Sequence, residues 1–128
     1  MDIEWMFVRY VLALFDAPIP ASAACRALVA VGIEPLDVAV FAMAEPAGWD
    51  SPYDMAVAVL AASESAARLS EMGVPAAEVL LYLEGLRQRG VLVAVRTPTA
   101  HAALAAACLN AVGAPSLLEH AALWHART

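Results

Sequence analysis

The three histidines are the residues of this sequence that most suggest a metal site, and their spacing does not bring them together. The histidines are His101, His120 and His125. Zinc requires three or four ligands that converge on one point, and proteins usually supply them as closely spaced pairs. His120 and His125 are five positions apart, a spacing that aligns poorly on a helix and worse on a strand. We therefore predict that the chain holds no metal.

Hydroxyl and carboxyl groups occur together in the segments Asp50-Ser51 and Ser63-Glu64-Ser65. No serine stands in the Gly-x-Ser-x-Gly sequence of a nucleophile elbow, so helix caps and solvated faces explain both segments better. The acidic residues Glu34 and Asp37 flank a turn, where carboxylates keep a surface soluble. The six glycines are scattered as helix stops and turns, and none belongs to a phosphate-binding loop. The sequence thus predicts no catalytic residues, no enzyme activity and no cofactor.

The two cysteines, Cys25 and Cys108, both fall within alanine-rich helical segments. A free cysteine in such a place behaves as a small buried hydrophobe, and cytosolic proteins keep their thiols reduced. The first residues, Met-Asp-Ile-Glu-Trp, include acids where a secretory signal needs basic residues. We therefore expect a cytoplasmic protein with both cysteines in its core, and we regard a disulfide or redox pair as the less favoured alternative.

Composition excludes further classes of protein. The net charge is −6, and the seven basic residues are dispersed arginines, so the chain lacks the cationic stripe that nucleic acid or anionic lipid requires. Although 62% of the residues are hydrophobic, the longest uncharged stretch, 97–118, is interrupted by Pro98, Asn110 and Pro115. A membrane-spanning helix needs about 20 consecutive apolar residues. We predict no nucleic-acid partner and no transmembrane segment.

Hydrophobic periodicity and turn signals divide the chain into strands and helices. Alternating β-branched and aromatic residues predict strands, and apolar residues three or four positions apart predict helices. Ser51-Pro52-Tyr53-Asp54 has the form of a capping box and predicts the start of a helix. In chain order we expect a strand over 7–15, a helix over 20–31, a strand over 37–43, a helix over 53–72, a helix from 75 to the glycine at 90, a strand over 91–95, a helix running to 110 or 112, and a short strand over 116–121.

This order of elements, β-α-β, two helices and β-α-β, predicts an α+β fold of the ferredoxin-like split β-α-β sandwich kind. We expect a four-stranded antiparallel sheet with both crossover helices on one face, and an extra helix between strand 2 and the second crossover helix. The first and third strands are the most apolar and should be central, with the shorter second and fourth strands at the edges. The chain, 1–128, should form a single domain with a core over about 7–121 and a C-terminal tail over 122–128.

The stretch over 73–95 resembles a known family. It contains a Gly-Val-Pro helix start, then a tyrosine followed by Glu-Gly and an arginine-rich turn, then a Val-Leu-Val strand, at residues 73–75, 82–90 and 91–93. In these features, and in its opening unit, the chain is similar to the bacterial heat-induced general stress protein family (YflT type) over roughly residues 8–121. The resemblance implies a ferredoxin-like domain of a stress or accessory protein and carries over no catalytic residue. The chain departs from the family in the capped helix expected before Gly73 and in its uncharged last helix.

The central strands are apolar on both faces, whereas a sheet with one face in water should alternate apolar and polar residues. Residues 91–95 are all valine, leucine or alanine, and Arg9 is the only charged residue of the first strand. The second face must be covered, either by the helix over 53–72 or by a second copy or a different protein. The last helix is also almost uncharged on both sides. The predicted interaction surface consists of apolar residues from the two central strands and the last helix: Val11, Ala13, Val91, Val93, Val95, Ala102, Ala103 and Ala106.

These features favour a non-catalytic protein-interaction or structural module, either a homodimer or a small accessory subunit of a larger bacterial assembly. One alternative is a small-molecule-sensing regulatory domain, with polar contacts from the turns Asp16-Ala17-Pro18 and Arg96-Thr97-Pro98-Thr99. A less favoured alternative is a dimeric α/β-barrel enzyme with Tyr10, Trp49 or His101 lining a cavity. The fold alone does not decide among these functions.

Overall fold

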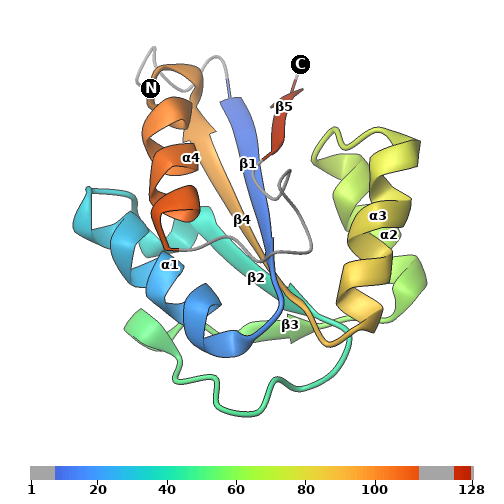
Figure 1. Cartoon of the computed structure of the whole chain (residues 1–128). Coiled ribbons are helices and arrows are strands. Elements are labelled where there is room, and N and C mark those ends of the chain that lie inside the picture. The colour runs from blue at the N-terminus through green and yellow to red at the C-terminus, as the bar shows by residue number, and fades with distance from the viewer. Residues whose placement is uncertain (1–7, 113–122, 128) are drawn as a thin grey trace.

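The computed structural model describes residues 8–112 in full and the backbone of residues 123–127 (Figure 1). The chain has an α+β fold, as the sequence predicts. Its strands and helices are β1 Val8–Phe15, α1 Pro18–Ala30, β2 Val38–Ala42, β3 Val57–Val59, α2 Ala62–Glu71, α3 Ala76–Arg87, β4 Val91–Pro98, α4 Ala102–Ala111 and β5 Leu123–Arg127, with short 3-10 turns at Pro35–Asp37, Pro52–Asp54 and Thr99–His101.

The strands form one mixed sheet in the order β3-β2-β4-β1-β5. β4 pairs antiparallel with β1 along the full length of both strands, from Val8 opposite Pro98 to Phe15 opposite Val91. β4 also pairs antiparallel with β2, and β5 pairs antiparallel with β1. The first and third predicted strands, β1 and β4, therefore lie inside the sheet as expected. The prediction of a purely antiparallel sheet with the second strand at an edge is wrong, because β3 is an additional strand that pairs parallel with β2 and forms that edge.

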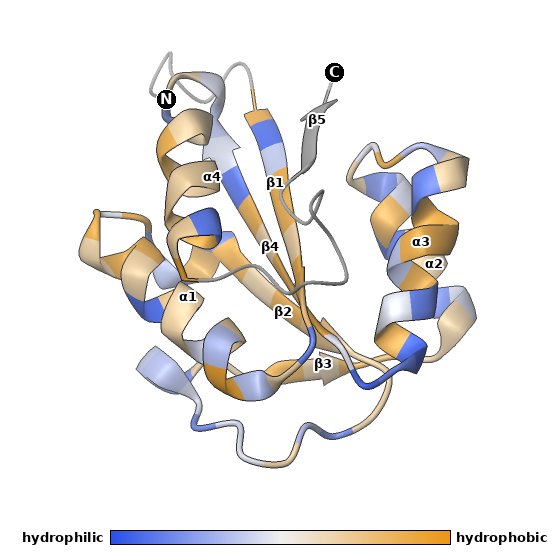
Figure 2. Cartoon of the chain, in the orientation of Figure 1, coloured by the Kyte–Doolittle hydropathy of each residue, from blue (hydrophilic) through white to orange (hydrophobic). Residues whose placement is uncertain are grey.

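Helices cover the sheet from both sides (Figure 1). The crossover helices α1 and α4 contact each other and pack on β1 and β4. Helices α2 and α3 also pair with each other, and they lie on the opposite side, where α3 contacts β1. Figure 2 shows that β1, β2 and β4, which lie between these helix pairs, are mostly hydrophobic.

Side chains alternate along the central strands and fill two hydrophobic clusters. Val11, Ala13 and Phe15 belong to the cluster beneath α1 and α4 and have no exposed surface. Leu12 and Leu14 belong to the cluster beneath α2 and α3 and are at most 2% exposed. The prediction that both faces of these strands are shielded from water is confirmed, and the helices that shield them belong to the same chain.

The segment between β2 and α2 contradicts the helix predicted over 53–72. Ser51 has a φ of 50° and its side chain caps no backbone group, whereas an N-cap residue has an extended backbone. Tyr53 also has a left-handed φ, of 53°, so the chain turns here instead of starting a helix. Residues Val57–Val59 then form β3, because alternating β-branched valines suit a strand better than a helix. Helix α2 begins only at Ala62.

The C-terminal part of the chain also differs from the prediction. The strand expected over 116–121 lies outside the described residues. Residues 123–127 were expected within a tail, but their backbone forms β5 and pairs with β1 from Val8 opposite Arg127 to Leu12 opposite Leu123. The edge of β1 offers backbone N–H and C=O groups that only another strand can pair in a regular ladder.

Helix α3 approaches β1 closely because two glycines near its C-terminal end lack side chains. A Cβ atom at Gly85 would lie 1.9 Å from Cδ2 of Leu14. A Cβ atom at Gly90 would lie 2.6 Å from the carbonyl oxygen of Gly85. Both distances are far inside ordinary van der Waals contact, which is about 3.5–4.0 Å. Gly85 and Gly90, both within the stretch that resembles the stress-protein family, thus have a packing role in this chain.

The helices of the described residues are too short to cross a bilayer. The longest, α1, has 13 residues, whereas a span needs about 20.

Candidate functional site

The residues predicted as an interaction surface are almost all in the core. Val11, Ala13, Val91, Val93 and Val95 are 0% exposed, because they lie on the face of the sheet that α1 and α4 cover. From α4 itself, two of the predicted residues also point into this core. They are Ala102 and Ala106. Among the eight, Ala103 alone is exposed. The sheet portion of the predicted surface is therefore corrected to core.

The opposite face of the sheet offers no open apolar area at its central strands either. Leu12, Leu14 and Leu92 are covered beneath α2 and α3. Further along the same face, Arg96 lies opposite Tyr10 in the strand register. Its guanidinium is about half exposed and donates a 3.0 Å hydrogen bond from Nη2 to the Asp37 carboxylate. A charged group on this face argues against a second copy packing there.

The outward side of α4 is the uncharged helical surface of the described chain. Helix α4 contains no Asp, Glu, Lys or Arg. Its buried positions pack on α1 and the sheet, and the remaining positions face solvent. We define the outer face of α4 as its exposed residues: Ala103, Leu104, Ala107, Asn110 and Ala111. Apart from the Asn110 amide, this face presents only methyl and isobutyl groups.

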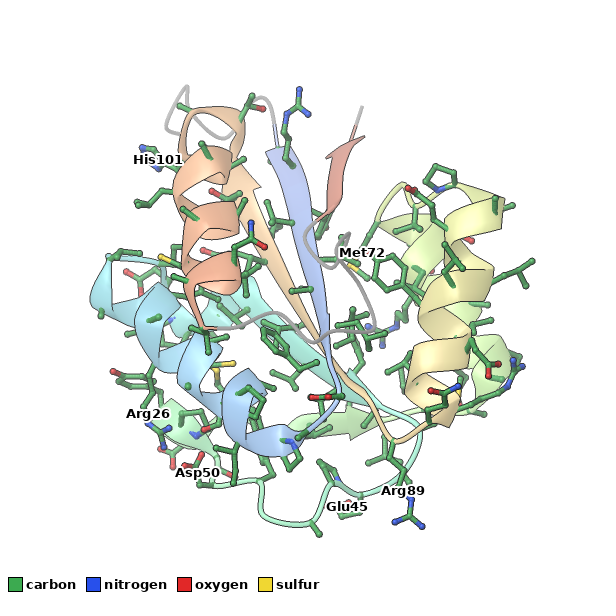
Figure 3. The ribbon with its side chains drawn as sticks, viewed as in Figure 1. Arg26, Glu45, Asp50, Met72, Arg89 and His101 are labelled. Carbon is green, nitrogen blue, oxygen red and sulfur yellow. The ribbon has the colours of Figure 1, made fainter. Side chains whose placement is uncertain are left out.

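A hollow of about 450 Å³ lies at the end of the sheet where β1 and β2 finish. The predicted turn Asp16-Ala17-Pro18 forms one wall. The loop that follows β2 and the turn before β4 form the rest, and Figure 3 shows Glu45 and Arg89 at this end of the molecule. We call this feature the sheet-end hollow and define it by its lining residues: Asp16, Ala17, Pro18, Ala44, Glu45, Pro46, Ala47 and Arg89.

The second predicted turn is not a turn at Arg96–Pro98, because these residues continue β4, and the segment borders a smaller hollow of about 190 Å³. Arg96, Thr97 and Pro98 line it together with Asp37 and His101. The Arg96–Asp37 ion pair occupies the polar groups that the segment could otherwise present to a ligand. The sheet-end hollow is therefore the stronger candidate of the two.

A polar cluster ties the loop after β2 to helix α1. The Ser22 hydroxyl donates to one carboxylate oxygen of Asp50, and Arg26 pairs with the other. Arg26 also donates a 3.0 Å hydrogen bond to the Ser22 hydroxyl. Figure 3 labels Arg26 and Asp50, which lie beside each other. The hydrogen bonds from Ser22 and Arg26 hold the pKa of the Asp50 carboxyl below its usual value. The lowered pKa makes the Asp50 carboxylate a poor base for activating the Ser22 hydroxyl, and we interpret the cluster as an anchor for the loop.

The three residues considered for an enzyme cavity do not come together. Tyr10 lines a small hollow beside α2, and His101 lines the hollow at Arg96. Trp49 packs against the core beneath α1 and donates a 2.9 Å hydrogen bond from its indole to the Met55 carbonyl. Tyr10, Trp49 and His101 therefore do not line one common cavity.

The cysteines and histidines show no metal-binding arrangement within residues 8–112, and the side chains of His120 and His125 lie outside the described part. Both Cys25 and Cys108 are free; Cys25 is fully buried as expected, whereas Cys108 is only partly buried against the core. Burial raises the pKa of the Cys25 thiol to about 12, which keeps it protonated and unreactive.

Sequence reasoning missed two sets of polar residues that the fold assembles. Glu45 and Arg89 meet the Asp16 turn only because three loops reach one end of the sheet. Ser22 and Asp50 are 28 positions apart, and no local spacing signals their contact. The alternating valines Val57 and Val59 favour a strand, and this pattern would have predicted that residues 43–56 form the loop between β2 and β3.

Comparisons with known proteins give no family or relative. No protein-family model, no curated protein and no solved structure matches this chain. The resemblance to the general stress protein family therefore gains no support, and the functional reasoning depends on this chain's own residues.

Proposed function

We propose that the protein is a non-catalytic interaction module that associates through the outer face of α4, as a homodimer or as a small accessory subunit of a larger bacterial assembly. The single observation that carries the proposal is the outer face itself. A helix at the surface of a globular protein normally turns a polar side to water, and a helix that is apolar all round is normally buried.

The other helices show that α4 differs from the rest of this alanine-rich chain. Exposed charged residues occur on α1 at Arg26, on α2 at Glu64 and Arg68, and on α3 at Glu84 and Arg87. A general excess of alanine would affect all four helices alike. The absence of charge on α4 is therefore specific to this helix, which supports a partner on its outer side.

Small side chains make the outer face of α4 suited to another helix. Ala103, Ala107 and Ala111 follow one another four positions apart, so they form a row along the helix. Packed helices approach to about 8–10 Å, and alanine rows permit the closer end of that range. Leu104, which is 46% exposed, would bury its side chain in such a contact.

We take a second copy of the chain as the occupant. In a two-fold interface each residue meets the same patch of its partner, so a charged face would bring like charges together. The outer face of α4 carries no charge and avoids that cost, although each chain has a net charge of −6. The exposed Leu80 and Leu81 of α3 are a poorer candidate for this interface, because the charged residues Glu84 and Arg87 follow them on the same helix.

The finer fold assignment and the location belong to the same proposal. Strands β2-β4-β1-β5 have antiparallel neighbours in the order of a ferredoxin-like split β-α-β sheet, and β3, α2 and α3 would be additions between β2 and β4. This order supports a ferredoxin-like domain. The free thiols of Cys25 and Cys108 support a reducing compartment such as the cytoplasm.

Molar mass in solution tests the proposal. By size-exclusion chromatography with light scattering at tens of micromolar, we expect the wild-type chain at twice its 13.4 kDa mass. Ala107→Glu, which places a carboxylate in the centre of the outer face, should run at 13.4 kDa. Ala67→Glu is the matched control, because Ala67 is an exposed alanine on α2.

The proposal fails in two ways. It fails if the wild-type chain is a monomer at these concentrations and Ala107→Glu has no effect on any complex the protein forms. It also fails if Ala67→Glu dissociates the dimer as fully as Ala107→Glu, because the contact would then not lie on α4.

A further inference from the structure

We propose that the sheet-end hollow binds a small zwitterion, such as a free amino acid or a short peptide. In this arrangement the ligand carboxylate pairs with Arg89 and its ammonium group lies near Asp16 and Glu45. The site is on a different part of the molecule from the outer face of α4, and the inference does not depend on dimer formation.

The topology brings three charged residues to this hollow from distant parts of the chain. β1 and β2 both run antiparallel to β4, so they finish at the same end of the sheet, where β4 begins. Asp16 follows β1, Glu45 follows β2, and Arg89 precedes β4. Ligands of layered α/β proteins commonly bind outside the carboxyl ends of strands, where loops converge.

The charges around the hollow have no ion-pair partner among the described residues. Three other arginines in this part of the chain are paired with carboxylates, as Arg26–Asp50, Arg87–Glu84 and Arg96–Asp37. Asp16, Glu45 and Arg89 belong to no such pair, although they line one cavity. Two carboxylates and one guanidinium therefore match a ligand that carries both an ammonium group and a carboxylate.

The chemistry of each group fits this ligand. A guanidinium presents its N–H donors in a planar fork that matches the two oxygens of a carboxylate. An ammonium group donates three hydrogen bonds, and carboxylates are its strongest acceptors. Arg89 also has a defined position, because its backbone is left-handed, with a φ of 68°, and its N–H donates a 3.2 Å hydrogen bond to the Leu86 carbonyl.

The size and the remaining walls limit the ligand. The volume of about 450 Å³ falls within the 300–1,000 Å³ that small-molecule sites usually occupy. Pro18 and Pro46 have no backbone N–H, and the other lining residues between the charges are alanines. These walls suit a short aliphatic side chain rather than further polar groups.

Calorimetric titration with matched probes tests the inference. The zwitterions are L-alanine, L-leucine and L-alanyl-L-alanine, and the singly charged controls are propionate and propylamine. We expect at least one zwitterion to bind more tightly than both controls. Arg89→Asn, a residue that tolerates the left-handed backbone, should weaken that binding about tenfold or more, as expected for loss of a charge-assisted pair.

A matched variant separates the role of the hollow from general charge. Arg87→Asn removes a nearby exposed guanidinium that does not line the hollow, and it should leave the affinity within about twofold. Glu45→Gln should weaken the zwitterion and leave any propionate binding unchanged. The inference is overturned if no zwitterion binds, if propionate or propylamine binds as tightly, or if Arg87→Asn weakens binding as much as Arg89→Asn.

Discussion

Replacing Gly85 with alanine tests the close packing of α3 on β1. The new Cβ atom would lie 1.9 Å from Cδ2 and 3.2 Å from Cγ of Leu14. Leu14 is 2% exposed, so its side chain has no solvent to move into. Either Leu14 must leave its preferred rotamer or α3 must move away from the sheet.

The magnitude follows from two opposing effects. In an unhindered helix, alanine is more stable than glycine by about 1 kcal/mol. Overpacking a closed core costs about 1–3 kcal/mol, and a contact as short as this one belongs at the upper end. We therefore expect Gly85→Ala to lower the free energy of unfolding by about 2 kcal/mol, opposite in sign to helix propensity.

Urea unfolding followed by circular dichroism measures this change, since a small domain loses about 1–3 kcal/mol of stability per molar urea. Ala67→Gly on the exposed side of α2 calibrates helix propensity in the same protein and should cost about 1 kcal/mol. A double-mutant cycle with Leu14→Ala identifies the clash, because truncating Leu14 should be less costly in the Gly85→Ala variant than in the wild type. The reasoning is refuted if Gly85→Ala is as stable as the wild type and the two substitutions are additive.

Four further outcomes are expected. Tyr82→Phe should raise the free energy of unfolding by about 1 kcal/mol in urea titrations, because the buried Tyr82 hydroxyl has no hydrogen-bond partner in the described structure; a loss of stability would mean that the hydroxyl is satisfied. Asp50 has a lowered pKa when folded, so its pairing with Ser22 and Arg26 stabilises the fold above the unfolded carboxyl pKa of about 3.9 and is lost as the pH falls through the folded value. Asp50→Asn should accordingly lower the urea midpoint at pH 7 and cost progressively less stability as the pH falls below about 3.9, and a loss that does not change with pH would contradict this account. The Cys25 thiol, with its pKa raised to about 12 by burial, should react with a thiol reagent at pH 8 only when the protein unfolds, as mass spectrometry of the labelled peptide would show; rapid labelling of the native protein would rule out the buried setting. Dimer affinity should rise between 20 and 300 mM salt in sedimentation equilibrium, since salt screens repulsion between two chains of net charge −6 and leaves an uncharged contact intact; a fall would point to ion pairs in the interface.

Local patterns in the sequence predict most of the elements correctly. β1, α1, β2, α3, β4 and α4 all lie where periodicity and turn residues place them, because each has a continuous pattern that neighbouring residues alone determine. The apolar character of both faces of β1 and β4 also predicted that both would be covered. This apolar pattern did not indicate which segment covers the second face. Helices α2 and α3 reach that face after a left-handed turn at Tyr53, which the local sequence pattern did not predict.

The elements that the sequence did not predict depend on contacts between distant residues. β3 has only three residues, and its pairing with β2 joins Val57 to Val40 across a long loop. β5 likewise becomes a strand through the edge of β1. The predicted interaction surface was misplaced for the same reason, because the burial of Val91 and Val93 depends on α1, about 60 residues earlier in the chain, as well as on α4.

Cross-linking at the centre of α4 tests most directly whether a second copy packs there. In a Cys108→Ser background, Ala107→Cys places one reactive thiol on the outer face of α4, while Cys25 stays buried. A short bifunctional maleimide should then join two chains covalently, whereas Ala67→Cys in the same background should run as a single 13.4 kDa chain under denaturing conditions. Joined chains at both positions alike, or at neither, would contradict an interface on α4.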